Sequence, residues 1–90
     1  MRASIAGFRY DTDKAELIGN HEHGTLVNDF SYWEASLYKT PRVGQYFLAG
    51  RGGPMTRFAR RIDNHTVGFG ERIIPISASE AIKWVDQYLN

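Results

Sequence analysis

The most regular alternation of apolar and polar residues lies in the middle of the chain. Within residues 30–38, the side chains of an extended strand fall on two sides, with Trp33, Ala35 and Leu37 on one and Tyr32, Glu34, Ser36 and Tyr38 on the other. Residues 45–49 alternate similarly, and the segment 39–44 between the two runs contains a proline and a glycine. Because so short a connection joins only antiparallel neighbours, the pattern predicts a β-hairpin.

Three further short strands are predicted, over residues 5–10, 15–20 and 73–76. Pro75 lacks the backbone N–H that a central strand needs, so the last of these strands is expected at a sheet edge or a strand end. The polar segment 20–29 predicts a loop or an irregular hairpin tip.

Two amphipathic helices are also predicted. Pro54 suits the first position of a helix, and the apolar residues after it keep the helical spacing i, i+3, i+4 and i+7: Met55, Phe58, Ala59 and Ile62. The pair Asp63-Asn64 is expected to end this helix. A second helix is expected to begin after Ser77, because Ser77 and Glu80 match a capping box. Its apolar stripe comprises Ala81, Ile82, Val85, Tyr88 and Leu89.

The order of these elements is β-β-β-β-α-β-α. It predicts an α+β fold, in which a mainly antiparallel sheet of four to five short strands carries both helices on one face. A chain of 90 residues is the size of one domain, expected to span residues 1–90. Cysteine is absent, which excludes disulfides and thiolate metal sites. No apolar run is long enough for a signal peptide or a membrane span, so we expect a cytoplasmic protein without membrane contacts.

Basic residues are concentrated in one part of a chain whose formal net charge is only +1. Residues 39–72 contain seven lysines and arginines but only two acidic residues. Arginine is enriched at the centres of protein interfaces. The predicted partner-binding surface therefore comprises Arg57, Arg60 and Arg61 on the polar side of the first helix and Arg51 just before it. The exposed tyrosines Tyr32 and Tyr38 are expected to flank this surface. Alternatively, the arginines form a solvated face and pair with acidic residues elsewhere in the fold.

The glycine-rich stretch 50-GRGGP-54 raises the question of phosphate binding. Its spacing matches neither a Walker loop nor a dinucleotide-binding fingerprint. Pro54 also removes a backbone donor at the position where an anion would be bound. We therefore interpret the stretch as a sharp turn, in which the glycines adopt backbone angles that are closed to other residues.

Candidate metal and catalytic groups are few. His21 and His23 would lie on one side of an extended segment, but no third ligand is identifiable and His65 is remote in sequence. We interpret them as exposed loop histidines and expect no metal site. The chain has no cysteine nucleophile and no G-x-S-x-G motif. No catalytic residue or cofactor is predicted, and the protein is expected not to be an enzyme. A small hydrolase or transferase without a recognisable motif is the alternative.

Four segments together resemble a family of small bacterial proteins encoded on phages, plasmids and integrative elements. They are 10-YDTDKAELIG-19, 34-EASLYKT-40, 46-YFLAGRGGPMT-56 and 72-RIIPIS-77. The resemblance covers nearly the whole chain and implies a shared fold, but it supplies no catalytic residues. Relatives tend to have an acidic residue where this chain has Arg51, so the positive segment is a feature of this member.

Small proteins from such elements often inhibit or adapt host machinery by binding it stoichiometrically. The resemblance therefore implies a non-enzymatic protein-binding module that blocks or modulates a host protein or nucleoprotein complex. The most specific form of this hypothesis is anti-CRISPR activity, in which the chain binds a CRISPR effector. The alternative is a nucleic-acid-binding accessory protein that uses the basic segment 51–61. The chain is expected to be a monomer or a homodimer, and the sequence leaves that choice open.

Overall fold

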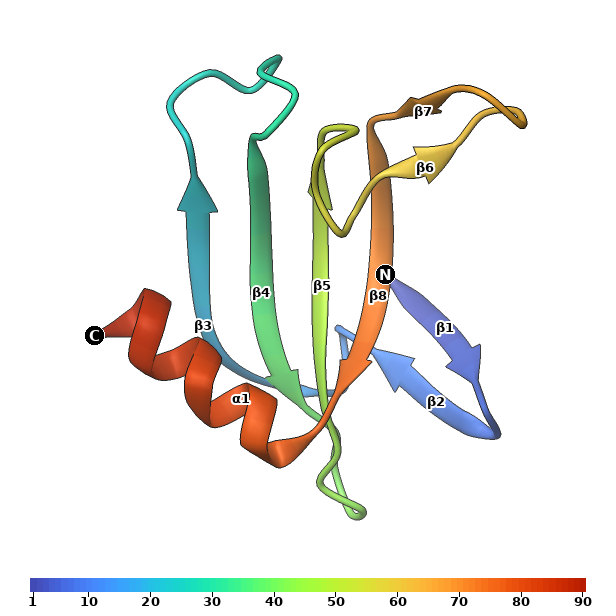
Figure 1. The fold of residues 1–90 in the computed structure, drawn as a ribbon. Helices are drawn as coiled ribbons and strands as arrows, with labels where there is room; N and C mark the ends of the chain where they lie inside the picture. Colours follow the sequence, from blue (N-terminus) through green and yellow to red (C-terminus); the bar gives the residue numbers. More distant parts are fainter.

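A four-stranded antiparallel sheet forms the centre of the protein in the computed structural model, which describes residues 1–90 (Figure 1). The strands follow the order β3-β4-β5-β8 across the sheet, and two separate hairpins, β1-β2 and β6-β7, flank it. In chain order the elements are β1 (Arg2–Ile5), β2 (Phe8–Asp11), β3 (Glu16–His23), β4 (Trp33–Lys39), β5 (Tyr46–Gly52), β6 (Arg60–Arg61), β7 (Val67–Gly68), β8 (Gly70–Ile76), α1 (Ala78–Trp84) and the π-helical turn η1 (Val85–Leu89).

The predicted central hairpin is confirmed. β4 and β5 pair antiparallel, with Leu37 directly opposite Leu48. Ala35 and Leu37 are buried, with 5% and 0% of their surface exposed, as the alternation predicts. β8 pairs only with β5 and is an edge strand, which agrees with the position expected for Pro75.

Each face of the sheet is covered over only part of its length. On one face, α1 packs Ala81 and Trp84 against a core that includes Leu37 and Leu48. On the other face, the β1-β2 hairpin packs Tyr10 against Phe47, with 5.3 Å between the ring centroids. Figure 1 shows α1 and this hairpin near one end of the sheet, whereas the loop 24–32, the turn 53–59 and the β6-β7 hairpin lie at the opposite end.

The start of the chain differs from the prediction. Residues 5–10 do not form one strand, because Ala6 and Gly7 both adopt positive φ angles, of 53° and 82°. Positive φ at two consecutive residues is typical of a two-residue hairpin turn, and here it folds β1 back onto β2. The predicted strand at 15–20 is confirmed as β3. It extends to His23, into the segment predicted to be a loop.

The first predicted helix is wrong, and the protein is mainly antiparallel β with a single helical segment near its C-terminal end. Residues 54–59 form turns, and Arg60 begins the short strand β6. Backbone bonds from Gly53 to Tyr32 and from Met55 to Phe30 tie this segment to the start of β4. The Thr56 hydroxyl also accepts a bond from the backbone N–H of Phe58. Such local side-chain bonds compete with helix formation, and so short a helix is weak on its own.

The second helix is confirmed, but its capping differs in one detail. The Ser77 hydroxyl accepts a 3.0 Å hydrogen bond from the backbone N–H of Glu80, as a capping box requires. The Glu80 carboxylate does not reach back to Ser77. It pairs instead with Arg57, at 3.0 Å. Ile82, which was assigned to the apolar stripe, is 63% exposed.

The glycines of the 50–54 stretch have a different role from the one expected. Gly50, Gly52 and Gly53 have no positive φ angles, so they do not provide unusual backbone conformations. A Cβ atom at Gly53 would overlap the carbonyl oxygen of Phe30. The stretch is architectural because it lets two backbone segments approach closely, which only glycine permits at this spacing.

Candidate functional site

The four arginines predicted to bind a partner do not share one helix face. Arg51 lies on β5, where its Nε donates a 2.6 Å hydrogen bond to Glu34 on β4. Arg57 lies in the turn 53–59 and pairs with Glu80. Arg60 and Arg61 form β6, are exposed and take part in no ion pair. Arg51 and Arg57 therefore match the alternative interpretation, and Arg60 and Arg61 remain available for a partner.

The two tyrosines predicted to be exposed are not. Tyr32 is 4% exposed, and its hydroxyl donates a 2.7 Å hydrogen bond to Glu34. Tyr38 is partly buried and stacks on Phe47, with 5.2 Å between the ring centroids. The alternation placed Tyr32 on the polar side of β4, but its side chain is buried, with Gly24 close to the ring and the Gly53 N–H bonded to the Tyr32 carbonyl.

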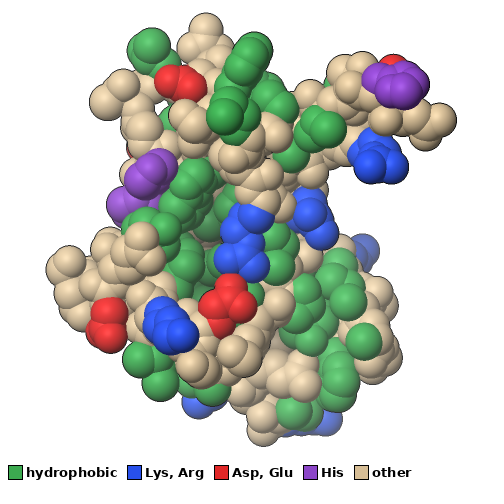
Figure 2. Space-filling model, viewed as in Figure 1, with side chains coloured by type: hydrophobic (Ala, Val, Ile, Leu, Met, Phe, Trp, Pro, Cys, Tyr) green, Lys and Arg blue, Asp and Glu red, His purple; other side chains and the backbone are tan.

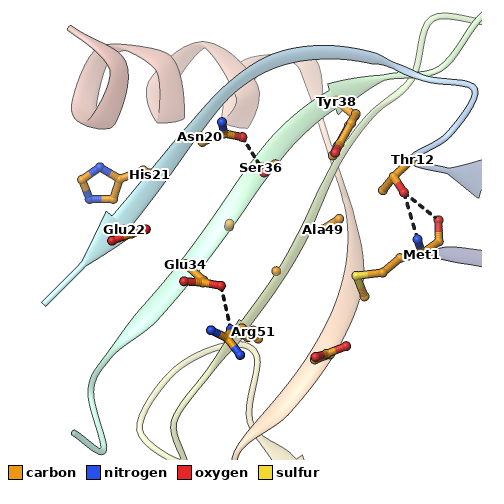
Figure 3. Close-up of a pocket in the computed structure, with 13 residues that line it drawn as sticks. Met1, Thr12, Asn20, His21, Glu22, Glu34, Ser36, Tyr38, Ala49 and Arg51 are labelled. Carbon is orange, nitrogen blue, oxygen red and sulfur yellow. Dashed lines mark hydrogen bonds and ion pairs between the residues drawn. The ribbon is translucent and has the colours of Figure 1, made fainter. Parts of the chain in front are cut away.

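A row of charged residues crosses the face of the sheet that α1 does not cover. Glu22, Glu34, Arg51 and Glu71 are direct cross-strand neighbours on β3, β4, β5 and β8 in turn. The row lies in an open polar cavity of about 630 Å³, whose other lining residues include Asn20, Ser36, Thr12 and Met1 (Figure 3). Figure 3 shows the Glu34–Arg51 pair joining β4 to β5, and the Asn20–Ser36 hydrogen bond joining β3 to β4 farther along the strands.

Hydrogen bonds shift the pKa values of Glu34 and of the adjacent Tyr32. The Tyr32 hydroxyl, and then the Arg51 guanidinium, lower the pKa of Glu34 below its ordinary value. The same bond to Glu34, with burial as a smaller cause, raises the pKa of Tyr32 to about 12. Glu34 is thus held as a carboxylate and Tyr32 as a neutral phenol. General acid–base catalysis is most efficient with a pKa near the operating pH, so this pair is better suited to fixing structure than to moving protons.

The lowered pKa of Glu34 predicts a pH dependence of stability. A group whose pKa is lower in the folded state contributes stability above its unfolded pKa, and this contribution is lost as the pH falls through the folded value. We expect wild-type protein to have a higher Tm than Glu34→Gln at neutral pH, with the difference shrinking below about pH 4.5, the ordinary pKa. Thermal melts of both proteins between neutral pH and pH 3 measure this difference. A difference in Tm that does not change with pH would contradict a lowered pKa of Glu34 in the folded protein.

The opposite end of the sheet from α1 exposes many apolar side chains. Figure 2, in the same view as Figure 1, shows hydrophobic groups at the top of the molecule among other atoms, as well as over its middle and lower right. We call this surface the apolar end. It comprises Leu26, Val27, Phe30, Met55, Ile62, Val67 and Phe69, which are 45% to 75% exposed. The bond from the Met55 N–H to the Phe30 carbonyl, 3.0 Å long, holds two of its three segments together.

An aromatic groove of about 380 Å³ opens next to the apolar end, between it and the helix. Trp33 lies at its centre, with the ring centroids of His23 and Tyr88 at 5.3 Å and 5.1 Å. Arg57 and Met55 also line the groove. Neither the apolar end nor the groove was predicted. The sequence contained one indication of the apolar end: apolar residues such as Leu26 and Val27 lie inside otherwise polar segments. They fit neither a strand nor a helix pattern.

The two histidines also differ from the prediction, because they lie on β3 rather than in a loop. His21 is partly buried, 4.6 Å from the Tyr88 ring, and its Nε2 atom is buried without a hydrogen-bond partner. The structure contains no group of three or more His, Cys, Asp or Glu side chains placed to hold a metal ion. It also contains no helix with the length and apolar character needed to cross a bilayer.

The predicted site residues therefore divide into three groups. Arg51 and Tyr32 belong to the Glu34 network, Arg57 lines the groove, and Arg60 and Arg61 form an exposed hairpin beside the apolar end. This arrangement combines exposed apolar side chains with two arginines that take part in no ion pair. No protein-family model, curated protein or solved structure matches this chain.

Proposed function

We propose that this chain is a non-enzymatic module that binds another protein through its apolar end. The observation that carries the proposal is that seven large apolar side chains, each at least 45% exposed, lie on three segments at one end of the sheet. Contiguous exposed apolar surface is uncommon on proteins that act alone and usually marks a contact site. The partner surface would be apolar at its centre.

The charges beside the apolar end favour a particular kind of partner. Arg60 and Arg61 lie on the same hairpin as Ile62 and Val67, and no acidic side chain pairs with them. Complementary charges at the rim of an interface speed association and disfavour wrong partners. We therefore propose a protein whose apolar patch is bordered by Asp or Glu residues placed to meet these two arginines.

The aromatic groove supports the same function. Most of the binding energy of a protein interface comes from a few side chains that fill well-packed pockets. The groove lies next to Met55, and its lining includes Trp33, Phe58, Trp84 and Tyr88. It would accept one apolar or aromatic side chain of the partner as an anchor.

The inhibitory role rests on the sequence resemblance. Proteins of mobile elements commonly block or modulate a host complex, and a CRISPR effector is the sharpest target for a protein of this size. The apolar end would act by occupying a surface that the target needs for its own assembly or substrate. Binding would be stoichiometric, and the Glu34–Tyr32 pair would remain in fixed protonation states throughout.

Nucleic acid is the second candidate partner, because Arg60 and Arg61 project on a two-stranded β-ribbon. The pairing of Arg51 and Arg57 with Glu34 and Glu80 reduces this basic surface. Each phosphate contact adds about −0.9 to the slope of log affinity against log salt. Contact through Arg60 and Arg61 would therefore give a slope of only about −2, well below that of dedicated DNA-binding proteins.

A pull-down with and without nuclease tests the proposed function. The tagged protein is immobilised, incubated with bacterial host lysate, and its bound proteins are identified by mass spectrometry. We expect a discrete protein that is retained after nuclease treatment and resists moderate salt. Loss of all bound protein after nuclease treatment would shift the function to nucleic-acid binding. Recovery of no protein above an untagged control would count against both readings.

A further inference from the structure

We propose that the free edge of β3 binds an extended segment of a partner protein as an added strand, with a lysine or arginine opposite Glu22. β3 is the outermost strand on its side of the sheet. Six of its eight residues are exposed. The residues of this edge differ from the seven residues of the apolar end, although His23 and Tyr88 also line the aromatic groove.

The outward-facing backbone of β3 has no partner within the chain. Every backbone–backbone hydrogen bond that residues 16–23 make belongs to regular secondary structure, where β3 pairs only with β4. In an edge strand, alternate residues direct their N–H and C=O groups away from the sheet. Such a row of unpaired groups is a template for an added strand.

The two edges of the sheet differ in their protection: η1 packs Leu89 against Gly19 of β3, but no segment pairs with the outer backbone of β3. On β8, Pro75 removes one donor, and Gly70 is in close contact with the backbone of Phe58 and with Arg60. Proteins usually protect free edges with proline, lysine or a bulge. β3 contains no proline, lysine or arginine. Its one irregularity lies between Leu17 and Gly19, which leaves Gly19 to His23 in regular register with β4.

The charge on β3 specifies the chemistry of the added strand. Glu22 lies directly opposite Glu34, and like charges in that position are destabilising. Glu34 is compensated by Arg51 and by the Tyr32 hydroxyl, whereas Glu22 is in no ion pair. Glu22 has a cross-strand neighbour, Glu34, on one side only. Its other neighbouring position would be filled by a residue of the added strand. A cation there would complete the charged row.

The two faces of the added strand would differ, and a second copy of β3 does not fit them. On the face opposite to Glu22, His21 and His23 lie close to the Tyr88 ring, at 4.6 Å and 6.3 Å. Apolar side chains of the added strand would extend this aromatic surface. Two copies of β3 paired with each other would place no cation opposite Glu22, because the strand has none. The occupant is therefore a strand from a different protein, basic on one face and apolar on the other.

Three synthetic peptides test this proposal. Each is an acetylated and amidated octapeptide, Val-Thr-Val-X-Val-Thr-Val-Thr, in which X is Lys, Gln or Glu. Affinity is measured by fluorescence anisotropy, and amide hydrogen exchange locates the contact. We expect slower exchange at residues 19–23 with the Lys peptide, and affinities in the order Lys, Gln, Glu, with roughly fivefold between the first and the last. The Glu22→Lys variant should reverse the order.

The matched control is Glu71→Lys, which makes the same change at the other end of the charged row. It should leave the order of the three peptides unchanged. Unchanged exchange at residues 19–23 would overturn the proposal, as would an order of affinities that Glu22→Lys does not alter. Slow exchange at the outward-facing amides of residues 19–23 in the protein alone, together with a dimer in analytical ultracentrifugation, would also overturn it, because a second copy would then occupy the edge.

Discussion

Replacing Phe58 with alanine should destabilise the protein by about 3–5 kcal/mol, the usual cost of removing a buried phenylalanine. Phe58 is 1% exposed and belongs to the core cluster that includes Leu48 and Trp84. Its ring lies 6.1 Å from that of Trp33. In a domain of this size each 1 kcal/mol lowers the Tm by roughly 4–8 °C. Thermal melts followed by circular dichroism should therefore show a drop of more than about 10 °C.

The control for this prediction is Met55→Ala in the same turn. Met55 is 75% exposed, so its truncation should change the stability by no more than about 0.5 kcal/mol. If residues 54–62 formed an amphipathic helix, both side chains would face the core and both variants would lose stability. Similar Tm values for the two variants would therefore contradict the observed turn and the isolated burial of Phe58.

The second large effect is expected on binding. We expect the triple variant Leu26→Ser, Phe30→Ser, Met55→Ser to lose the nuclease-resistant partner of the pull-down while keeping its Tm within a few degrees. The three side chains are 63%, 63% and 75% exposed, so the fold does not depend on them. Truncating a dominant interface residue costs about 2 kcal/mol or more. The loss of two such contacts weakens affinity roughly a thousandfold.

The control for this variant is Val43→Ser combined with Ile82→Ser. These residues are 68% and 63% exposed, and they lie in the 40–45 loop and on α1, away from the apolar end. The control removes apolar surface of a similar kind and should retain the partner. Equal retention by the triple-serine variant and wild type would remove the apolar end from the binding surface. Loss in both variants would indicate a general dependence on surface hydrophobicity.

The parts of the fold that could be predicted are those in which local pattern and tertiary environment agree. The alternation in β4 correctly placed Ala35 and Leu37 in the core, and Ser77 correctly marked the start of the final helix. The prediction of a helix at 54–62 was wrong because the spacing of its apolar residues shows only that they recur at helical intervals. It does not show which of them are buried, and of that stripe Phe58 is buried while Met55 and Ile62 are exposed.

The candidate site was less predictable, because it depends on contacts between distant segments. Arg51 meets Glu34 from 17 residues away, and Arg57 meets Glu80 from 23 residues away. Neither pairing leaves a local signal in the sequence. Tyr32 alternates as an exposed strand residue would, but it is buried next to Gly24 and its carbonyl bonds to Gly53, which follows β5. The apolar end is assembled from three segments that only the sheet brings to one place.

Under the proposed function, the uneven covering of the sheet separates the residues needed for folding from those that would contact a partner. The helix and the β1-β2 hairpin lie near one end, whereas every residue of 22–31 and of 60–67 is exposed. Substitutions in these two segments alter the contact surface at little cost to the core, in the same way that loops on a rigid scaffold vary among related binding proteins. Such a protein can acquire a new target by local sequence drift. For an inhibitor whose target changes to escape it, this freedom is an evolutionary advantage that a uniformly packed domain of the same length would lack.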